Sequence, residues 1–521
     1  MKKLFNALLI TVISCSYVHA QTISSDYIDS VMQSSMDLMP QAGVAVAVVQ
    51  DGKIIHSKGY GIASVNKKTE VDENTLFAIA SNSKAFTTTA LAQLVDEGKL
   101  KWTDKVVDII PEFKMYDPYV TEAFNIQDLI THRSGLGLGA GDLLIFPDGN
   151  DFTFEDIVKS FQYQTPVSAF RTKYDYDNLL YIVAGEVIHR ISGKPWDEYV
   201  EEKLIDPLGM NRTKALFRNL GNTENIASPH HIADGELHEL EPYARNDAGF
   251  GAAGGIYSSV NDMSKWVIMH LNEGKYGDSL EHTMVSQQNH DELWKAHTNT
   301  FFDATPQGPY KTHYRAYGLG FFLFDQNGYT IVQHSGGLPG MLSMVTMIPE
   351  LNAGIIVLTN SHPGGYSFVS MTNAIKDKLI GAEEVDWMGR INSYLSRSDG
   401  FADSVVNSVW ETVEKANTKP IDVTNFIGTY KDDWFGEITI ELIDDELWFK
   451  SKRSSKLKGQ MFFYNANTFA IKWEYKDMDC DALASFRLDE LGKAQSIRLR
   501  GISPNIDFSF DFQDLELERI D

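Results

Sequence analysis

A serine and a lysine stand three residues apart in the segment AIASNSKAFTTTAL, residues 78–91, where an apolar run passes into a helix-like pattern. On a helix these two residues share a face, so the amine of Lys84 can lie beside the hydroxyl of Ser81. Apolar surroundings favour a neutral lysine, which can take the proton of a serine nucleophile. The pair therefore predicts nucleophilic catalysis. The alternative is that Ser81 caps a helix and Lys84 is a surface residue.

Two further Ser-x-x-Lys pairs begin at Ser64 and Ser455, and both lie in polar stretches typical of solvated loops. Only Ser81 follows an apolar run and precedes apolar residues at helical spacing, up to a predicted helix end at Gly98. The context therefore selects the pair at Ser81 from the three.

Tyr176 and Asn178 stand at the entrance of a second helical pattern, DNLLYIVAGEVIHRIS, residues 177–192. A tyrosine near a lysine ammonium has a lowered pKa and can act as a general base, while an asparagine amide can hold a substrate carbonyl or N–H. The alternative is that Tyr176 packs in the core and Asn178 caps the helix.

His334 and Gly336 lie between two strand-like runs, in the segment VQHSGGLPGMLS. A strand edge lined with glycines lets a substrate backbone approach closely, and its free N–H groups can stabilise an oxyanion. A second His-x-Gly triplet, at His362, is interpreted as a turn. The glycines of residues 135–141 carry no lysine, so they predict a flexible rim of an active site rather than a nucleotide-binding loop.

Composition and motifs exclude several other classes. The formal net charge of −25 repels phosphate backbones, so no nucleic-acid partner is expected. The nearest metal-like segment, HHIADGELHELEP, has Pro242 where a zinc-binding helix would need its second histidine. This segment is interpreted as a surface loop, and neither a metal nor another cofactor is expected.

In their order and wide spacing, the motifs resemble those of the serine β-lactamase and penicillin-binding-protein superfamily, and more closely its class C-like branch of peptidases and esterases. The motifs are Ser81-x-x-Lys84, Tyr176-x-Asn178 and His334-x-Gly336. The strings ITHRSGLG and GAAGGIYSSVNDMSKWV are similar to two further segments of that family.

The resemblance implies an acyl-enzyme mechanism. Ser81 would attack a carbonyl carbon, with Lys84 and Tyr176 sharing the proton transfers and water later releasing the acyl group. The backbone N–H groups of Ser81 and Gly337 would hold the oxyanion, and Asn178 would orient the substrate amide. The implied substrates are small amides, D-amino-acid peptides or esters, with β-lactams among the candidates.

One residue departs from the pattern of the family. Members that bind a penicillin or peptide carboxylate commonly have lysine where this chain has His334. Histidine is mostly neutral at pH 7 and has a shorter reach. The departure favours an aminopeptidase, amidase or esterase over efficient β-lactam hydrolysis. The alternative is a penicillin-binding or sensor-type protein that acylates without efficient turnover.

The chain is expected to fold as a β-lactamase/DD-peptidase-like α+β domain followed by a small all-β barrel domain. Strand-like runs at both ends of residues 21–384 surround a helical middle, which predicts one antiparallel sheet with a helical subdomain. Residues 385–420 are polar and helix-like, as expected of a connector. Short alternating strands fill residues 421–521 and resemble the lipocalin-like β domain appended to such hydrolases. That domain is expected to wall one side of the cleft.

The N-terminus resembles a secretory signal. Residues 1–20 combine two lysines, an apolar stretch and a small-residue cleavage site, which predicts a periplasmic or secreted protein. A competing cleavage before Cys15 would leave a lipid anchor, and membrane association is expected only in that case. The other cysteine, Cys480, would then have no intramolecular partner in the mature chain.

Overall fold

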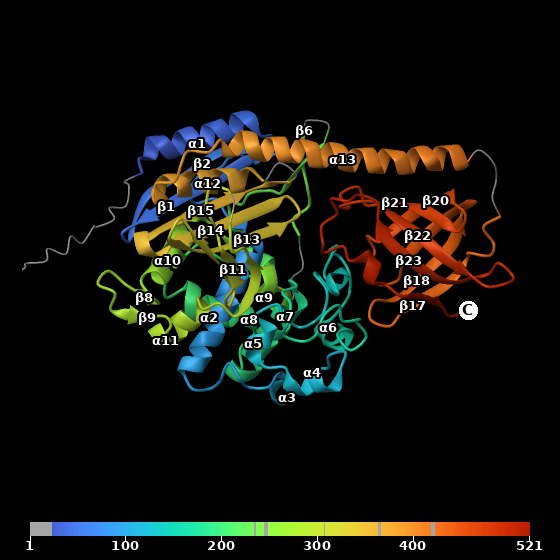
Figure 1. The fold of residues 1–521 in the computed structure, drawn as a ribbon, viewed down its shortest axis with the longest axis horizontal. Helices are drawn as coiled ribbons and strands as arrows, with labels where there is room; N and C mark the ends of the chain where they lie inside the picture. The colour runs from blue at the N-terminus through green and yellow to red at the C-terminus, as the bar shows by residue number, and fades with distance from the viewer. Residues whose placement is uncertain (1–22, 234–235, 244–247, 307, 363–365, 418–421) are drawn as a thin grey trace, which may run out of the picture.

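The computed structural model describes residues 23–233, 236–243, 248–306, 308–362, 366–417 and 422–521. They form an α+β body and a β-barrel joined by one long helix (Figure 1). The predicted signal segment and Cys15 lie outside the described residues. Among the described residues, no helix combines the length and the apolar character needed to cross a membrane.

A nine-stranded antiparallel sheet forms the centre of the α+β body, in the order β10-β11-β12-β13-β14-β15-β1-β2-β3. Its strands are β1 (Gly43–Gln50), β2 (Lys53–Ser64), β3 (Thr69–Glu70), β10 (Thr298–Phe302), β11 (Tyr314–Tyr317), β12 (Phe322–Gln326), β13 (Tyr329–Leu338), β14 (Met341–Ile348) and β15 (Ala353–Thr359). Because β1 pairs with β15, strands from both ends of the domain meet in one sheet, as predicted.

Helices cover both faces of this sheet. Strands β1 and β15 are buried along their full length, as expected of strands that lie between two layers. On one face, α1 (Ser25–Leu38) and α12 (Ser367–Ile380) pack on alternate residues of β1 such as Val46. On the other face, α10 (Val260–Leu271) and the helical subdomain pack on residues such as Ala47.

The helical subdomain contains α2 (Ser83–Asp96), α3 (Val106–Ile109), α4 (Pro118–Ala123), α5 (Ile126–Leu129), α6 (Phe154–Ser160), α7 (Leu179–Ser192), α8 (Trp196–Val200), α9 (Ala248–Gly254) and α11 (Gln287–Leu293). Short strands accompany it: β4 (Phe77–Ala78), β5 (His230–Ala233), β6 (Glu236–Glu239), β7 (Tyr257–Ser258), β8 (Lys275–Tyr276), β9 (His282–Thr283) and β16 (Ser361–His362). The histidine-rich segment predicted as a surface loop is the β5–β6 hairpin. Its first residue, His230, is fully buried because β5 pairs with β16.

The C-terminal strands close into a barrel of eight strands. They are β17 (Gly428–Asp432), β18 (Gly436–Ile443), β19 (Glu446–Ser451), β20 (Lys458–Asn465), β21 (Thr468–Trp473), β22 (Ala482–Leu488), β23 (Ala494–Gly501) and β24 (Leu517–Arg519). Aromatic side chains pack together in its core, with the rings of Phe469 and Phe486 5.7 Å apart. The predicted fold, an α+β domain followed by a small β-barrel, is confirmed.

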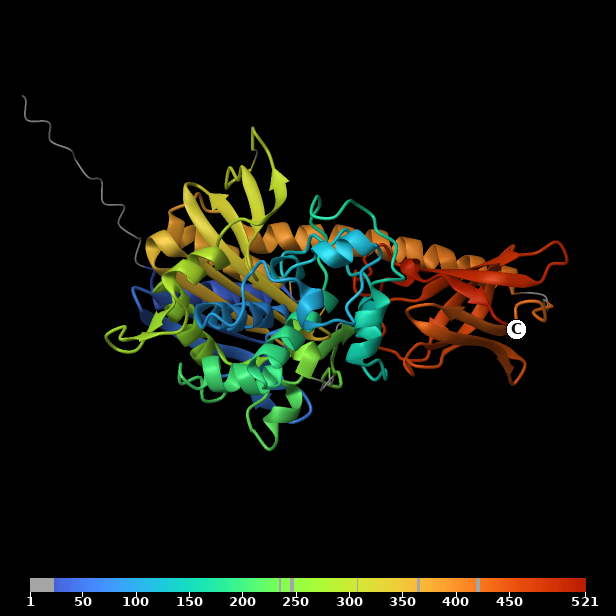
Figure 2. The same cartoon turned by 90° about the horizontal axis from the view of Figure 1, so that it is seen from below.

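The helix α13 (Trp387–Ala416) connects the two bodies, in the segment expected to be a connector. In Figures 1 and 2 it runs from the side of the sheet covered by α1 and α12 to the barrel. Near its start, Trp387 donates a hydrogen bond to Asp377 of α12 (2.6 Å). Near its end, Val409 and Val413 pack on barrel residues that include Leu483.

The barrel also contacts the helical subdomain directly. Between β19 and β20, Arg453 pairs with Asp151 (2.7 Å) and Asp156 (2.8 Å), and Lys456 pairs with Asp148 (2.7 Å). The stretch around Ser455, predicted to be a solvated loop, therefore lies at an interface between domains. The prediction was wrong because the acidic partners of these basic residues are about three hundred positions away in the chain.

Candidate active site

Ser81 lies in a tight turn between the sheet and α2. It is the middle residue of a 3₁₀ turn, Ala80–Asn82, and α2 begins two residues later, at Ser83. Ser81 thus precedes the helix that it was predicted to open. Ala80 has a φ of 48°, a left-handed conformation that is unusual for a residue with a side chain. The turn is held by the sheet, because the hydroxyl of Ser343 on β14 donates to the carbonyl of Ile79 (2.7 Å).

The amine of Lys84 is buried beside the hydroxyl of Ser81. Lys84 is 0% exposed, so it is not the surface residue of the alternative interpretation. Its Nζ lies 3.0 Å from Ser81 Oγ, 2.8 Å from Asn178 Oδ1 and 2.8 Å from the carbonyl oxygen of Ala253. Burial lowers the pKa of Lys84 to about 7, although the carboxyl groups of Asp142 and Asp177 oppose the shift. A substantial fraction of this lysine is therefore neutral at pH 7.

Tyr176 lies against both members of this pair. Its ring centroid is 4.8 Å from Lys84 Nζ, and its hydroxyl is hydrogen-bonded to Ser81. Burial raises the pKa of Tyr176 well above 10, so the predicted lowering of its pKa was wrong. The reason is that burial of the phenol outweighs its hydrogen bond with Ser81, which lowers the pKa. At pH 7 the side chain is a neutral phenol, able to donate a proton.

The side chain of Asn178 points into the site. Its Oδ1 accepts from Lys84, and its Nδ2 donates to Asp142 Oδ2 (2.8 Å). Asn178 stands at the N-cap position of α7, but its side chain makes no capping hydrogen bond. The neighbouring Asp177 accepts from the backbone N–H of Leu180 instead (3.2 Å). The site therefore brings Asn178 together with Lys84, and the capping alternative does not describe it.

His334 lies beneath the site, within a cluster of tyrosines. It is only 3% exposed. Its Nε2 accepts from the hydroxyl of Tyr317 (3.0 Å), and its Nδ1 donates to the carbonyl of Ser335 (2.6 Å). Burial lowers the pKa of His334 to about 3, so the imidazole is neutral. Since both ring nitrogens are bonded within the protein, neither is directed at a substrate.

Gly336 and Gly337 bring β13 close to the turn that carries Ser81. A Cβ atom at Gly336 would collide with the carbonyl oxygen of Ile79, whereas one at Gly337 would meet only the end of the Leu342 side chain. Gly337 is exposed and pairs with Leu342 of β14. At Gly336 the close neighbour of the strand is therefore the protein's own turn at Ile79, and not the substrate backbone that was expected there.

Comparison with known proteins concerns the family and the fold of this chain. The sequence profile of the β-lactamase family matches residues 28–379, and that of a domain of unknown function (DUF3471) matches residues 413–519. The chain belongs to the β-lactamase family. This family member is 28% identical to the unguisins hydrolase ungD of Aspergillus violaceofuscus over 431 residues, 78% of this chain and 75% of that protein. It is 26% identical to protein flp of Staphylococcus aureus over 65% of this chain and 63% of flp.

Two solved structures share the fold of this β-lactamase family member. One is an octameric penicillin-binding protein homologue from Pyrococcus abyssi, with a TM-score of 0.59 at 19% identity over 95% of this chain and 100% of that one. The other is a penicillin-binding protein from Bacillus halodurans, with a TM-score of 0.53 at 21% identity over 67% of this chain and 98% of that one. At these identities the likeness concerns the fold.

The site of this β-lactamase family member also contains a histidine that the sequence did not single out. The ring of His132 lies 4.2 Å from that of Tyr176 and 4.6 Å from that of Tyr317. Its Nδ1 accepts from the backbone N–H of Asp177 (3.0 Å), which places the proton on Nε2. Burial, Lys84 and His334 keep the pKa of His132 well below 6.5. His132 is therefore a neutral imidazole that packs against the ring of Tyr176. Its only sequence signal was its place in the string ITHRSGLG.

Two buried carboxyl groups, one from each domain, also lie behind Asn178. Asp511 of the barrel domain accepts hydrogen bonds from the backbone N–H groups of Gly141 (2.8 Å) and Leu143 (2.9 Å), on either side of Asp142. Burial and the Asp511 carboxyl raise the pKa of Asp142 well above its usual range, against the hydrogen bond from Asn178. The glycine-rich rim is thus held by the barrel, which residue spacing could not reveal.

Asp511→Asn is expected to lower kcat/KM about tenfold, by weakening the support of Asn178. An amide has one acceptor atom, so its NH₂ group would face one of the two backbone N–H groups that the carboxyl now accepts. Steady-state kinetics test this expectation. The matched control is Asp445→Asn, which changes an exposed aspartate in the β18–β19 turn. Thermal unfolding identifies the folded fraction. Unchanged kcat/KM in folded Asp511→Asn would contradict a positioning role.

Proposed function

We propose that this protein is an exported serine hydrolase that forms an acyl-enzyme at Ser81 with small amide or ester substrates. The observation that carries the proposal is the set of partners around Lys84 Nζ. A neutral amine has two N–H donors, which match the oxygens of Asn178 and Ala253. Its lone pair is then left for the hydroxyl proton of Ser81, 3.0 Å away.

The proposed reaction follows from these positions. Ser81 Oγ bonds to the substrate carbonyl carbon while its proton passes to Lys84, and the oxyanion lies at the backbone N–H groups of Ser81 and Gly337. When the carbonyl re-forms, the bond to the amine or alcohol breaks, and the leaving group takes a proton from Lys84 through the neutral phenol of Tyr176. Water then attacks the ester carbon and gives a proton to the same pair. The bond between the acyl carbon and Ser81 Oγ breaks, the acid leaves, and Oγ takes that proton back.

The proposed substrates are D-amino-acid peptides, amides or esters, with β-lactams as weaker candidates. The neutral, internally bonded imidazole of His334 supplies no positive charge for a substrate carboxylate. The relative named as an unguisins hydrolase supports hydrolysis as the outcome. The alternative is a penicillin-binding or sensor-type protein that acylates without efficient turnover.

The two candidate functions differ in the number of turnovers. A hydrolase converts many substrate molecules per protein molecule, whereas a penicillin-binding sensor is labelled at most once. Product measured against protein concentration for a penicillin, a D-alanine amide and an activated ester separates them. More than stoichiometric product from any of the three supports the hydrolase.

Acylation is expected to accelerate as the pH rises through about 7. The pKa of Lys84 is lowered to about 7, and only the deprotonated amine can accept the proton of Ser81, so the rate is low below this pH and reaches a plateau above it. Burial also raises the pKa of Asp177 to about 7, which makes Asp177→Asn the matched control. Pre-steady-state acylation rates at pH 5 to 9 test the assignment. Loss of the ascending limb in Asp177→Asn would contradict it.

A further inference from the structure

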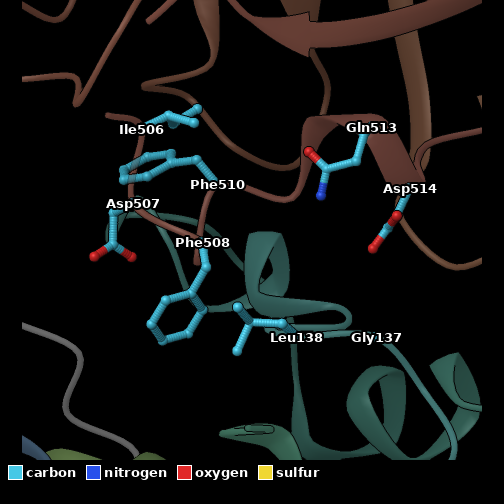
Figure 3. A pocket seen from close by; sticks show the side chains of 8 residues that line it. All are labelled: Gly137, Leu138, Ile506, Asp507, Phe508, Phe510, Gln513 and Asp514. Atoms are coloured by element: carbon cyan, nitrogen blue, oxygen red, sulfur yellow. The ribbon is translucent and has the colours of Figure 1, made fainter. Parts of the chain in front are cut away.

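A cavity lies between the barrel domain and the rim of the candidate active site. Its volume is about 330 Å³, within the range of small-molecule sites. From the rim it is lined by Gly137 and Leu138. From the barrel domain it is lined by Ile506, Asp507, Phe508, Phe510, Gln513 and Asp514. Figure 3 shows the ring of Phe508 extending from the barrel segment towards Leu138.

The cavity adjoins the proposed catalytic tyrosine. The ring of Phe508 meets that of Tyr176 edge to face, with centroids 5.9 Å apart. On the rim, Gly139, the residue after Leu138, donates its backbone N–H to the carbonyl oxygen of Tyr176 (2.8 Å). A substrate part that occupies the cavity would therefore be one side chain away from the residue bonded to Ser81.

The lining is apolar and acidic. Leu138 and Phe508 are 47% and 38% exposed, so their apolar surfaces are available to a ligand. Asp507 and Asp514 are the ionisable residues of the lining, and none of its eight residues is basic. In Figure 3 the carboxyl group of Asp507 lies on the same side as the rings of Phe508 and Phe510, and that of Asp514 lies on the other side. Carboxylates and aromatic faces attract an ammonium group, and the same carboxylates repel an anion.

We propose that this cavity is a substrate subsite that binds an apolar group bearing an ammonium ion, such as an amine-terminated or basic aromatic side chain. The inference rests on the proposed function, because it concerns the substrate of the same site. If so, the barrel domain would make the site favour cationic over anionic substrates. It agrees with the absence of a positive charge on His334 in selecting against carboxylates.

Binding of phenethylammonium to the full-length Ser81→Ala protein tests the subsite, with phenylacetamide as its neutral analogue. Calorimetry is expected to show at least about fivefold tighter binding of the ammonium compound. This preference should disappear in the double variant Asp507→Asn/Asp514→Asn. The matched control is Asp444→Asn/Asp445→Asn, which removes two charges from an exposed turn of the same barrel at positive-φ positions that asparagine tolerates.

Equal affinity for the two compounds would overturn the inference, as would an unchanged preference in the folded Asp507→Asn/Asp514→Asn protein. Acylation of the unsubstituted protein is measured separately with an activated ester. Acylation at Ser81 without a preference for the ammonium compound would remove the subsite and leave the hydrolase standing. A preference without acylation by any substrate would remove the hydrolase.

Discussion

Ser81→Ala is expected to reduce turnover by about 10⁴-fold or more. The substitution removes the atom that forms the acyl bond. It leaves the fold in place, because the partners of the Ser81 hydroxyl among the described residues, Lys84 and Tyr176, both belong to the candidate site. Turnover and thermal unfolding, measured on the same preparation, check both expectations.

Ser83 provides the matched control for this substitution. Its hydroxyl is buried on the same segment and accepts the backbone N–H of Ile256 (3.1 Å), away from the reacting atoms. Ser83→Ala is expected to lose about 1 kcal/mol of stability and to keep its ability to acylate. Turnover above about one per cent in Ser81→Ala would contradict the role given to Ser81.

Lys84→Met is expected to slow acylation by about 10²- to 10⁴-fold, the usual contribution of a general base. Methionine fills the buried space of the lysine stem without an amine. Lys84→Arg should be similarly slow, because a guanidinium keeps its proton at any pH at which the protein is folded. Single-turnover rates of the two variants show whether position 84 must accept a proton or only carry a positive charge. A fast Lys84→Arg would mean that the site needs a positive charge and no proton acceptor.

The Lys84→Met protein is also expected to differ in the pH dependence of its stability. The pKa of Lys84 is about 7 in the folded protein, whereas an unperturbed lysine, as in the unfolded chain, has a pKa of 10.5. The unfolded chain therefore binds more protons than the folded protein between these two pH values. The free energy of unfolding therefore gains a component that rises with pH from about 7 to 10. Denaturant titrations should show this component in the unsubstituted protein and not in Lys84→Met. Equal slopes in the two would contradict the lowered pKa.

Sequence patterns predicted much of the fold, and local signals singled out Ser81 and Lys84 after an apolar run and Tyr176 and Asn178 at a helix entrance. That the two pairs meet was implied by the resemblance to the β-lactamase superfamily, because Lys84 and Asn178 are 94 positions apart. The antiparallel sheet and the barrel were predictable from alternating strands. These features depend on patterns within a few residues of one another.

The features that the sequence missed depend on burial and on three-dimensional contacts that residue spacing does not determine. Asp511 reaches the rim across 370 positions, and no spacing rule links it to Gly141. The direction of the Tyr176 pKa shift depends on burial, which the neighbouring residues do not determine. His334 was expected at the substrate, but two nearby hydrogen-bond partners, Tyr317 and Ser335, occupy its nitrogens.

Intact-mass spectrometry tests directly whether Ser81 forms the proposed covalent acyl bond. The protein and Ser81→Ala are exposed briefly to a penicillin, a D-alanine amide and a short activated ester. An acyl adduct or turnover is expected with at least one compound and should be lost in Ser81→Ala, with the amide or ester reacting in preference to the penicillin. An adduct that persists in Ser81→Ala, or no adduct and no turnover with all three, would contradict it.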